Sequence, residues 1–267
     1  MIKLIASDID GTLMPYGRTE LDPRLFPLIH RLREQGVLFC PASGRQFHSL
    51  RRLFAPIANE IAFLCENGAI LYGAGTEEDA PVLSKTVMEQ EKALALCHDI
   101  LALPEGAHIV ISGANTSYLM TADAPFREQL VAVTGNATAL VDRPEDVPEE
   151  ILKVSLYRHS GAEPDADLLG PRWAEQFRMT LAGPGWLDFM SADKGDGIRG
   201  ICAALGLTPD EVVAFGDHYN DVPMLEAVGI PYMMEGSDDY LKGRFPRHCS
   251  NVEDTLEEIL AGLERKA

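Results

Sequence analysis

The sequence predicts an α/β protein: a doubly wound parallel-sheet core with a second lobe inserted into it. Two observations support this fold class. Short apolar runs alternate with helical segments over residues 1–82, and the same alternation returns after residue 190. Between them the order changes, because several strands follow one another with fewer helices. Strands that alternate with helices imply a parallel sheet covered on both faces.

The first segment contains the expected core elements in order. Strands are predicted at residues 3–7 and 37–43, each followed by a helix, at 22–36 and 45–54. Residues 60–73 hold two more short strands around Asn67-Gly68, a dipeptide typical of hairpin turns.

The middle segment predicts an α+β lobe. A helix at 88–102 precedes strands at 108–113, 116–121, 137–141, 151–158, 177–182 and 186–190, with Pro/Gly/Asp-rich breaks between them. The core pattern then returns with helices at 194–206, 220–228 and 252–266 and strands at 211–217 and 229–234. We therefore expect a core of residues 1–82 plus 188–267 and an inserted cap of residues 83–187, which can close over a cleft.

Charge and hydropathy restrict the partners. The 267-residue chain carries a net charge of −18, so nucleic acid and acidic membrane surfaces are not expected as partners. No apolar run approaches the roughly 20 residues that cross a bilayer, and no targeting segment is recognisable, so a cytoplasmic location is expected. A small phosphorylated molecule remains compatible with this charge if a cation neutralises it locally. The oligomeric state cannot be read from the sequence.

The cysteines predict neither a disulfide framework nor a zinc site. They are five in number, widely spaced and without a CxxC pair. We expect buried free thiols at Cys40, Cys65, Cys97, Cys202 and Cys249.

Polar residues gather where the predicted strands end, which is where open α/β sheets bind ligands. Any one cluster has an ordinary explanation, since Asp, Asn, Ser and Gly also form turns and cap helices. Four clusters in such positions favour a shared site. They are Asp8, Asp10 and Thr12; Ser43, Gly44 and Arg45; Asp217, Asn220 and Asp221; and Lys194.

The four clusters make chemical sense together. Asp8, Asp217 and Asp221 supply the oxygen ligands that suit Mg²⁺. Ser43 can donate to phosphate oxygens, and Lys194 adds a positive charge beside them. Asp8 could then attack phosphorus to give an aspartyl phosphate, while Asp10 protonates the leaving oxygen and later takes a proton from water.

The same residues resemble a known family. "DIDGT" at 8–12, "SGR" at 43–45, Lys194 and "GDHYND" at 216–221 resemble the four signature motifs of the haloacid dehalogenase (HAD) superfamily. "ENGA" at 66–69 and the insertion resemble its Cof-type sugar-phosphatase branch. The resemblance implies a Rossmann-like core with an α/β cap, Mg²⁺ dependence and hydrolysis of small phosphate monoesters such as sugar phosphates.

The resemblance also implies residue roles. Asp8 is the nucleophile and a metal ligand, and Asp10 is the acid/base whose backbone carbonyl also faces the metal. Asp217 and Asp221 complete the metal site. The phosphoryl group is held by Thr12, Ser43, Gly44, Lys194 and Asn220, and the candidate substrate contacts are Arg45, Asn67, Asn115 and Arg158.

The sequence departs from the family pattern at Asp196 and at Glu235 and Ser237, which affects substrate contacts rather than phosphoryl chemistry.

Other functions remain open. A phosphomutase uses the same core and a related cap. A phospho-accepting receiver domain or a non-catalytic binding protein would share some of the acidic residues, but a receiver is far shorter. The substrate is not readable from the sequence.

Overall fold

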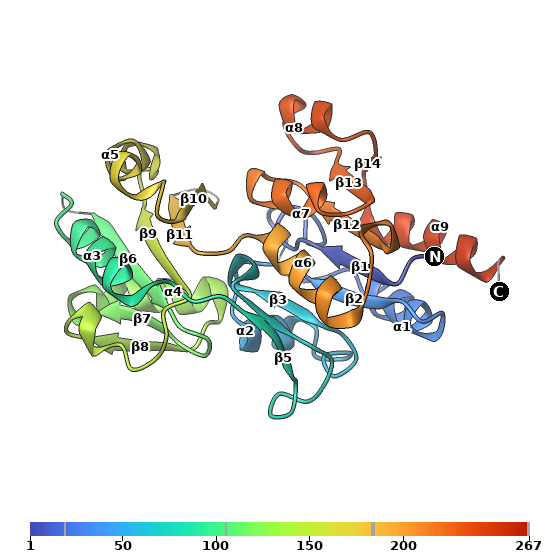
Figure 1. Ribbon diagram of the computed structural model, residues 1–267, viewed down its shortest axis with the longest axis horizontal. Helices are drawn as coiled ribbons and strands as arrows, with labels where there is room; N and C mark the ends of the chain where they lie inside the picture. Colours follow the sequence, from blue (N-terminus) through green and yellow to red (C-terminus); the bar gives the residue numbers. More distant parts are fainter. Residues whose placement is uncertain (19, 105, 183–184, 266–267) are drawn as a thin grey trace.

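The computed structural model describes residues 1–18, 20–104, 106–182 and 185–265. Two lobes lie side by side, with the cap on the left of Figure 1 and the core, which carries both chain termini, on the right. The predicted α/β class, with a parallel core and a separate cap, is confirmed.

The core is built on a five-stranded sheet whose paired strands all run parallel, in the order β14-β13-β12-β1-β2. The strands are β1 (Leu4–Ser7), β2 (Leu38–Pro41), β12 (Val212–Gly216), β13 (Ile230–Met234) and β14 (His248–Cys249). Ser7 lies opposite both Pro41 and Phe215. Strands β12, β1 and β2 therefore end level with one another, and the residues that follow them meet at one edge.

Helices cover both faces of this sheet because successive strand residues point to opposite sides. Ile5 packs with α1 (Leu25–Glu34), α2 (Phe47–Leu53) and α9 (Val252–Glu264). Its neighbours Leu4 and Ala6 pack with α6 (Lys194–Leu205), α7 (Val222–Glu226) and α8 (Asp239–Arg244).

A small antiparallel sheet joins the core to the cap. It consists of β3 (Phe63–Cys65), β4 (Ile70–Tyr72) and β5 (Val82–Lys85), in that order. The two strands predicted around Asn67-Gly68 are therefore present, but they leave the parallel sheet. A single parallel bridge from Ala42 to Leu64 connects β3 to the end of β2. This bridge brings the turn between β3 and β4 close to the residues that follow β2.

The cap holds a six-stranded sheet in the order β10-β11-β9-β6-β7-β8, antiparallel except for the β7–β8 pair. Its strands are β6 (Ala107–Ser112), β7 (Ser117–Met120), β8 (Thr138–Val141), β9 (Lys153–Arg158), β10 (Arg178–Leu181) and β11 (Trp186–Met190). Strand β11 thus continues past residue 187, where we placed the end of the cap.

One face of the cap sheet packs on α3 (Gln90–Leu101) and α5 (Glu163–Trp173) in a core that includes Trp173. On the other face, α4 (Ala124–Thr134) covers Val110 and Leu119. Short 3₁₀ turns complete the fold at Glu66–Gly68, Thr121–Asp123, Pro144–Asp146, Pro209–Glu211 and Tyr219–Asp221.

Two predictions from composition can be compared with the structure. All five cysteines are buried and free, as expected. Among the described residues, no helix combines the length and apolar character needed to span a bilayer.

Candidate active site

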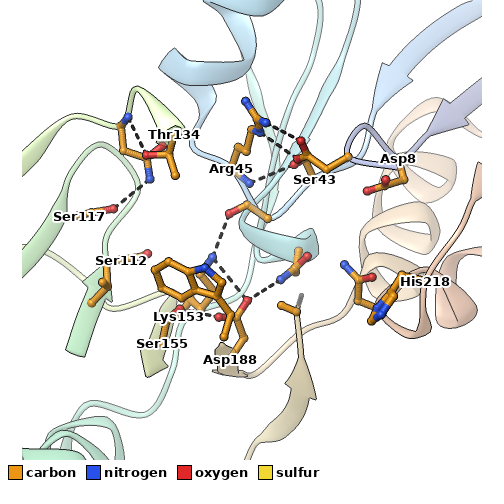
Figure 2. A pocket seen from close by; sticks show the side chains of 18 of the residues that line it. Asp8, Ser43, Arg45, Ser112, Ser117, Thr134, Lys153, Ser155, Asp188 and His218 are labelled. Carbon is orange, nitrogen blue, oxygen red and sulfur yellow. Dashed lines mark hydrogen bonds and ion pairs between the residues drawn. The ribbon is translucent and has the colours of Figure 1, made fainter. Parts of the chain in front are cut away.

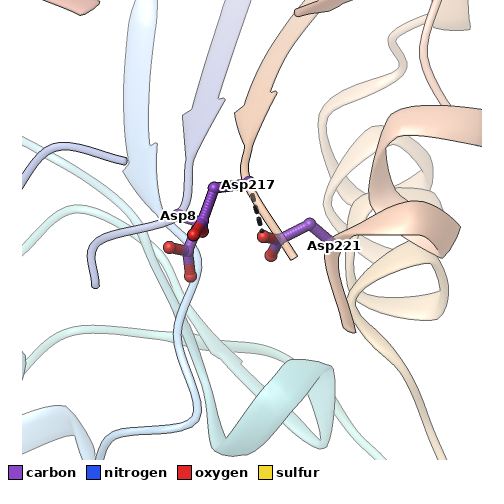
Figure 3. Close-up of side chains that lie close together, drawn as sticks. All are labelled: Asp8, Asp217 and Asp221. Carbon is purple, nitrogen blue, oxygen red and sulfur yellow. Dashed lines mark hydrogen bonds between the residues drawn. The ribbon is translucent and has the colours of Figure 1, made fainter. Parts of the chain in front are cut away.

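Three aspartates meet at the carboxyl edge of the core sheet. Asp8 directly follows β1 and Asp217 directly follows the neighbouring β12, while Asp221 lies in the short turn after it. One carboxylate oxygen from each lies within 4.8 Å of the others, and all three residues are buried (Figure 3). The parallel register, not sequence proximity, brings Asp8 to the other two.

Lys194 joins two of these carboxylates. Its side chain is fully buried, and Nζ lies 2.6 Å from Oδ1 of Asp8 and 2.5 Å from Oδ1 of Asp221. Lys194 is the first residue of α6, and this helix start is fixed by a reciprocal cap between Asp193 and Asp196. Asp196, a departure from the family pattern, therefore has a structural role here.

The charges in this cluster depend on one another. Burial raises the pKa of Asp8 well above its usual range, and the Asp221 carboxylate raises it further, whereas Lys194 opposes both. Burial also raises the pKa of Asp217. Burial works against the charge on Lys194, but Asp221 and Asp8 still raise its pKa. One ammonium thus faces three carboxyl groups.

This arrangement fits a divalent cation. Three carboxylates against one lysine leave an excess of negative charge in a buried place, which a cation would neutralise. In addition, Oδ2 of Asp8 is buried and has no hydrogen-bond partner among the described residues. A buried carboxylate oxygen without a partner is costly, so the site has a place for a further positively charged or electrophilic group.

Asp10 lies beside this cluster but outside it. Its carboxylate accepts from Arg45, at 2.6 Å from Nη2 and 3.1 Å from Nε (Figure 2). The side chain is about half exposed and lines the cleft. Because Arg45 occupies both oxygens, this pair has to open before either oxygen can reach a leaving group.

The turn after β1 needs glycine. Gly11 has a φ of +102°, and a Cβ there would lie 2.1 Å from Oδ2 of Asp217. Thr12 donates to the other oxygen of Asp217 at 3.2 Å, and the hydroxyl of Tyr16 donates to Oδ2 at 2.9 Å. In this structure Thr12 therefore contacts a proposed metal ligand.

The loop at 43–45 is held against the turn between β3 and β4. The amide of Ser43 donates to the carbonyl of Leu64, and the amide of Asn67 donates to the carbonyl of Ser43 at 3.0 Å. The Asn67 side chain continues toward the cap, donating to Asp188 at 3.0 Å. Glu66 and Asn67 adopt φ values of 48° and 54°, which are unusual for residues other than glycine.

A cavity of about 370 Å³ runs from this edge to the face of the cap sheet that α4 partly covers. The predicted site residues that line it are Asp8, Asp10, Ser43, Gly44, Arg45, Asn67, Asp217 and Asn220. Two predicted substrate contacts lie elsewhere. Asn115 is exposed and does not line the cavity. Arg158 pairs with the buried Asp165 inside the cap at 2.6 Å.

The cavity wall on the cap side was not anticipated from the sequence. It includes Lys153, Ser155, Trp186 and Asp188, with Ser155 donating to Asp188 at 2.6 Å (Figure 2). A signal for it was present in the sequence. In "LKVSLYR" every second residue is polar or amphipathic, which predicts that one face of this strand is not covered by apolar packing.

A model of the haloacid dehalogenase-like hydrolase family matches residues 5–255 of the chain. The chain belongs to this family. The predicted superfamily and its Cof-type branch are therefore confirmed, and the protein is a hydrolase of phosphoric monoesters, a phosphatase.

Bacterial relatives match this chain over most of its length. The 5-amino-6-(5-phospho-D-ribitylamino)uracil phosphatase YbjI of Escherichia coli is 28% identical, over 100% of this chain and 98% of that protein. The pyridoxal phosphate phosphatase YbhA of the same species is 27% identical over 91% of each. A haloacid dehalogenase-like hydrolase from Bacteroides thetaiotaomicron shares the fold, with a TM-score of 0.81, 22% identity, and coverage of 97% of this chain and 100% of that one.

Proposed function

We propose that this phosphatase uses Mg²⁺ and an aspartyl phosphate on Asp8 to hydrolyse small phosphorylated metabolites. The observation that carries the proposal is the buried cluster of Asp8, Asp217 and Asp221 around Lys194, at the inner end of the cavity. Such a cluster is costly unless a cation compensates its excess of negative charge.

The first step is attack by Asp8 on phosphorus. Lys194 fixes the carboxylate through Oδ1 and leaves Oδ2 without a partner, as a nucleophile requires. The new Oδ–P bond forms while the bond from phosphorus to the leaving oxygen breaks. Ser43 and Asn220 line the same end of the cavity and are placed to donate to the phosphoryl oxygens.

Asp10 then acts as the general acid and, in the second step, as the general base. It has to release Arg45, carry a proton and give it to the leaving oxygen. In the second step Asp10 takes a proton from the water that attacks phosphorus, while the Oδ–P bond breaks and releases inorganic phosphate and the free Asp8 carboxylate. The released Arg45 guanidinium lines the cavity and can pair with phosphate instead.

The ligands for the cation would be Asp8, Asp217 and Asp221, with the carbonyl of Asp10 as a further candidate. A bound Mg²⁺ would neutralise negative charge on the carboxylates and on the phosphoryl oxygens. Thr12 and Tyr16 hold the Asp217 carboxylate in place for this role.

The cap face indicates what kind of leaving group the cavity takes. Strand register places three rows across it: Ser112 and Lys153 next to the core, then Val110, Ser155 and Asp188, and then His108, Tyr157 and Trp186. Hydrogen-bonding groups thus lie near the phosphoryl end, and Val110, Leu130 and Trp186 offer apolar surface farther out.

We infer that the substrate is a phosphate ester with a hydrogen-bonding spacer, such as a hydroxylated chain, and a planar ring at its far end. The spacer would contact the polar rows, and the ring would lie against Trp186. The relatives support this inference, because YbjI is named for a substrate with a ribityl chain and a uracil ring, and YbhA for pyridoxal phosphate. Their phosphatase names also favour hydrolysis over the phosphomutase alternative.

The test is phosphate release with Mg²⁺ from four compounds: p-nitrophenyl phosphate, ribitol 5-phosphate, pyridoxal 5′-phosphate and 5-amino-6-(5-phospho-D-ribitylamino)uracil. We expect the last to have the highest kcat/KM, about ten- to a hundredfold above ribitol 5-phosphate, which lacks the ring. Equal values for these two would refute the ring site. No release from any compound would refute the proposed chemistry.

A further inference from the structure

A buried lysine of the cap reaches into the core. Lys153, the first residue of β9, places Nζ 2.7 Å from Oε2 of Glu66 and 2.9 Å from the carbonyl oxygen of Gly44. Its side chain is only 9% exposed, and Asp188 lies 3.8 Å away (Figure 2). Glu66 and Gly44 both belong to the core, so this one ammonium group joins the two lobes.

The two charges of this pair depend on each other. Glu66 is 1% exposed, and Lys153 is the cation that pairs with it within the described ranges. Burial raises the pKa of Glu66 and Lys153 opposes this shift, whereas Glu66 and Asp188 raise the pKa of Lys153 against the effect of burial. Removing Lys153 would leave the buried Glu66 carboxylate without its paired cation, whereas removing Glu66 would leave Lys153 with Asp188, 3.8 Å away.

The pair acts on the loop that carries Ser43. Besides the bond from Asn67 to Ser43, the amide of Glu66 donates to the carbonyl of Arg45 at 3.2 Å. Lys153 therefore contacts this loop directly at Gly44 and indirectly through Glu66. Glu66 and Asn67 hold unusual positive φ values at this point, which fits a conformation imposed by the surrounding contacts.

Other contacts between the lobes differ in kind. Gln46 donates to Ser117 at 2.9 Å, and the Ser49 hydroxyl donates to the carbonyl of Thr134 at 2.6 Å, but both bonds are neutral. Lys85, at the end of β5 in the joining sheet, pairs with Glu150 of the cap at 2.6 Å, but this pair is exposed to solvent. Lys153 combines burial, charge and direct contact with the loop at 43–45.

We propose that Lys153 is a positioning residue that couples the cap to the loop at 43–45. Through Glu66 and Gly44 it holds this loop in the geometry that receives the phosphoryl group when the cap lies against the core. Its role goes beyond leaving-group recognition, because it acts on the phosphate end of the site. The inference rests on the phosphatase activity of the protein and not on the identity of the substrate.

The test compares K153M, E66Q and the double variant with K85M, a control that removes an exposed lysine pair between the joining sheet and the cap. For each protein we would measure kcat and KM on p-nitrophenyl phosphate, inhibition by inorganic phosphate, the Mg²⁺ concentration for half activity and the melting temperature. We expect K153M to lower kcat/KM by about a hundredfold, since a small displacement of a catalytic loop has this effect. Inhibition by phosphate should weaken, while the Mg²⁺ requirement should not change.

The double variant should recover part of the loss, because it removes the unpaired Glu66 charge but not the need for a contact to Gly44. It should stay at least about tenfold below the parent protein. K85M should match the parent within about twofold, as expected for an exposed ion pair.

Three outcomes would overturn the proposal: K153M no worse than K85M, unchanged inhibition by phosphate in K153M, or a double variant with the activity of the parent. If K153M does not fold, the activity and phosphate inhibition of the double variant test the proposal instead. An inactive parent protein would instead count against the phosphatase chemistry itself, so the two failures are distinguishable.

Discussion

The two walls of the cavity are built in different ways. The core wall gathers residues from distant parts of the chain, because β12, β1 and β2 end level and each is followed by a polar turn. The cap wall is one face of a sheet, where alternate residues of β6, β9 and β11 stand in rows. The first arrangement concentrates buried charge, and the second grades from polar to apolar.

This difference predicts different consequences of substitution. In the core wall the charges depend on one another, because Lys194 pairs with both Asp8 and Asp221, so one substitution should disable the chemistry for every substrate. In the cap wall the rows contact separate parts of a leaving group, so a substitution should change the order of preference among substrates. The predictions below test this contrast, beginning with the largest expected effect.

Asp8→Asn should abolish activity on all substrates, with a loss of at least about a thousandfold, because no nucleophile remains. Mass spectrometry of the quenched enzyme should show no phospho-protein, whereas the parent should show it. A melting curve near that of the parent would exclude unfolding as the cause. Phosphorylation of the variant protein at another residue would contradict the assignment of Asp8.

Chelation should stop phosphate release, and added Mg²⁺ should restore it, since the aspartate cluster lacks a compensating charge without a cation. Mg²⁺ should also raise the melting temperature, because a ligand at a hundred times its dissociation constant stabilises by about 2.7 kcal/mol. Asp221→Asn, which weakens the proposed cation site, should reduce this shift. Full activity in a chelator would contradict the metal site.

Asp10→Asn should discriminate between leaving groups. A nitrophenolate leaves without a proton, whereas the alkoxide of ribitol 5-phosphate needs one. The loss in kcat should therefore be smaller for p-nitrophenyl phosphate than for ribitol 5-phosphate, measured under identical conditions. Equal losses would argue against Asp10 as the acid.

Trp186→Ala should change substrate preference without disabling the enzyme. We expect kcat/KM for a ring-bearing phosphate to fall by about tenfold and that for ribitol 5-phosphate to change little. Leu168→Ala is a suitable control, because Leu168 is an exposed apolar residue of the cap outside the cavity. An equal loss of kcat/KM on both substrates would contradict the assignment of the ring to Trp186 and of the hydroxylated chain to the polar rows.

The smallest effect concerns a carboxylate outside the site. Glu253 in α9 is buried, its Oε1 has no hydrogen-bond partner in the part of the chain that the structure describes, and burial raises its pKa. An acid with a raised pKa costs stability at pH values above its ordinary pKa of about 4.3. Glu253→Gln should therefore raise the melting temperature at pH 7 by about 2–4 °C. The gain should disappear as the pH falls toward 4, and a gain that persists there would refute this cause.

Much of the core wall was predictable from the sequence, because its residues lie close in the chain to the apolar strands that position them. Apolar runs marked β1, β2 and β12, and Asp8, Ser43 and Asp217 follow these strands within two residues. Since parallel strands end at a common edge, a correct strand order was enough to expect these residues in one place. The guesses for the cap had no such rule behind them, and Asn115 and Arg158 lie outside the cavity.

The sequence by itself determined the periodicity of each strand and helix and the side chains that follow each strand, since these depend on neighbouring residues. Tertiary structure alone decided that β3 leaves the parallel sheet, that Arg45 holds Asp10, and that Lys153 of the cap pairs with Glu66 of the core. Each of these contacts joins residues far apart in the chain. The free energy that selects them comes from burial and charge compensation between residues distant in the chain, which no local pattern encodes.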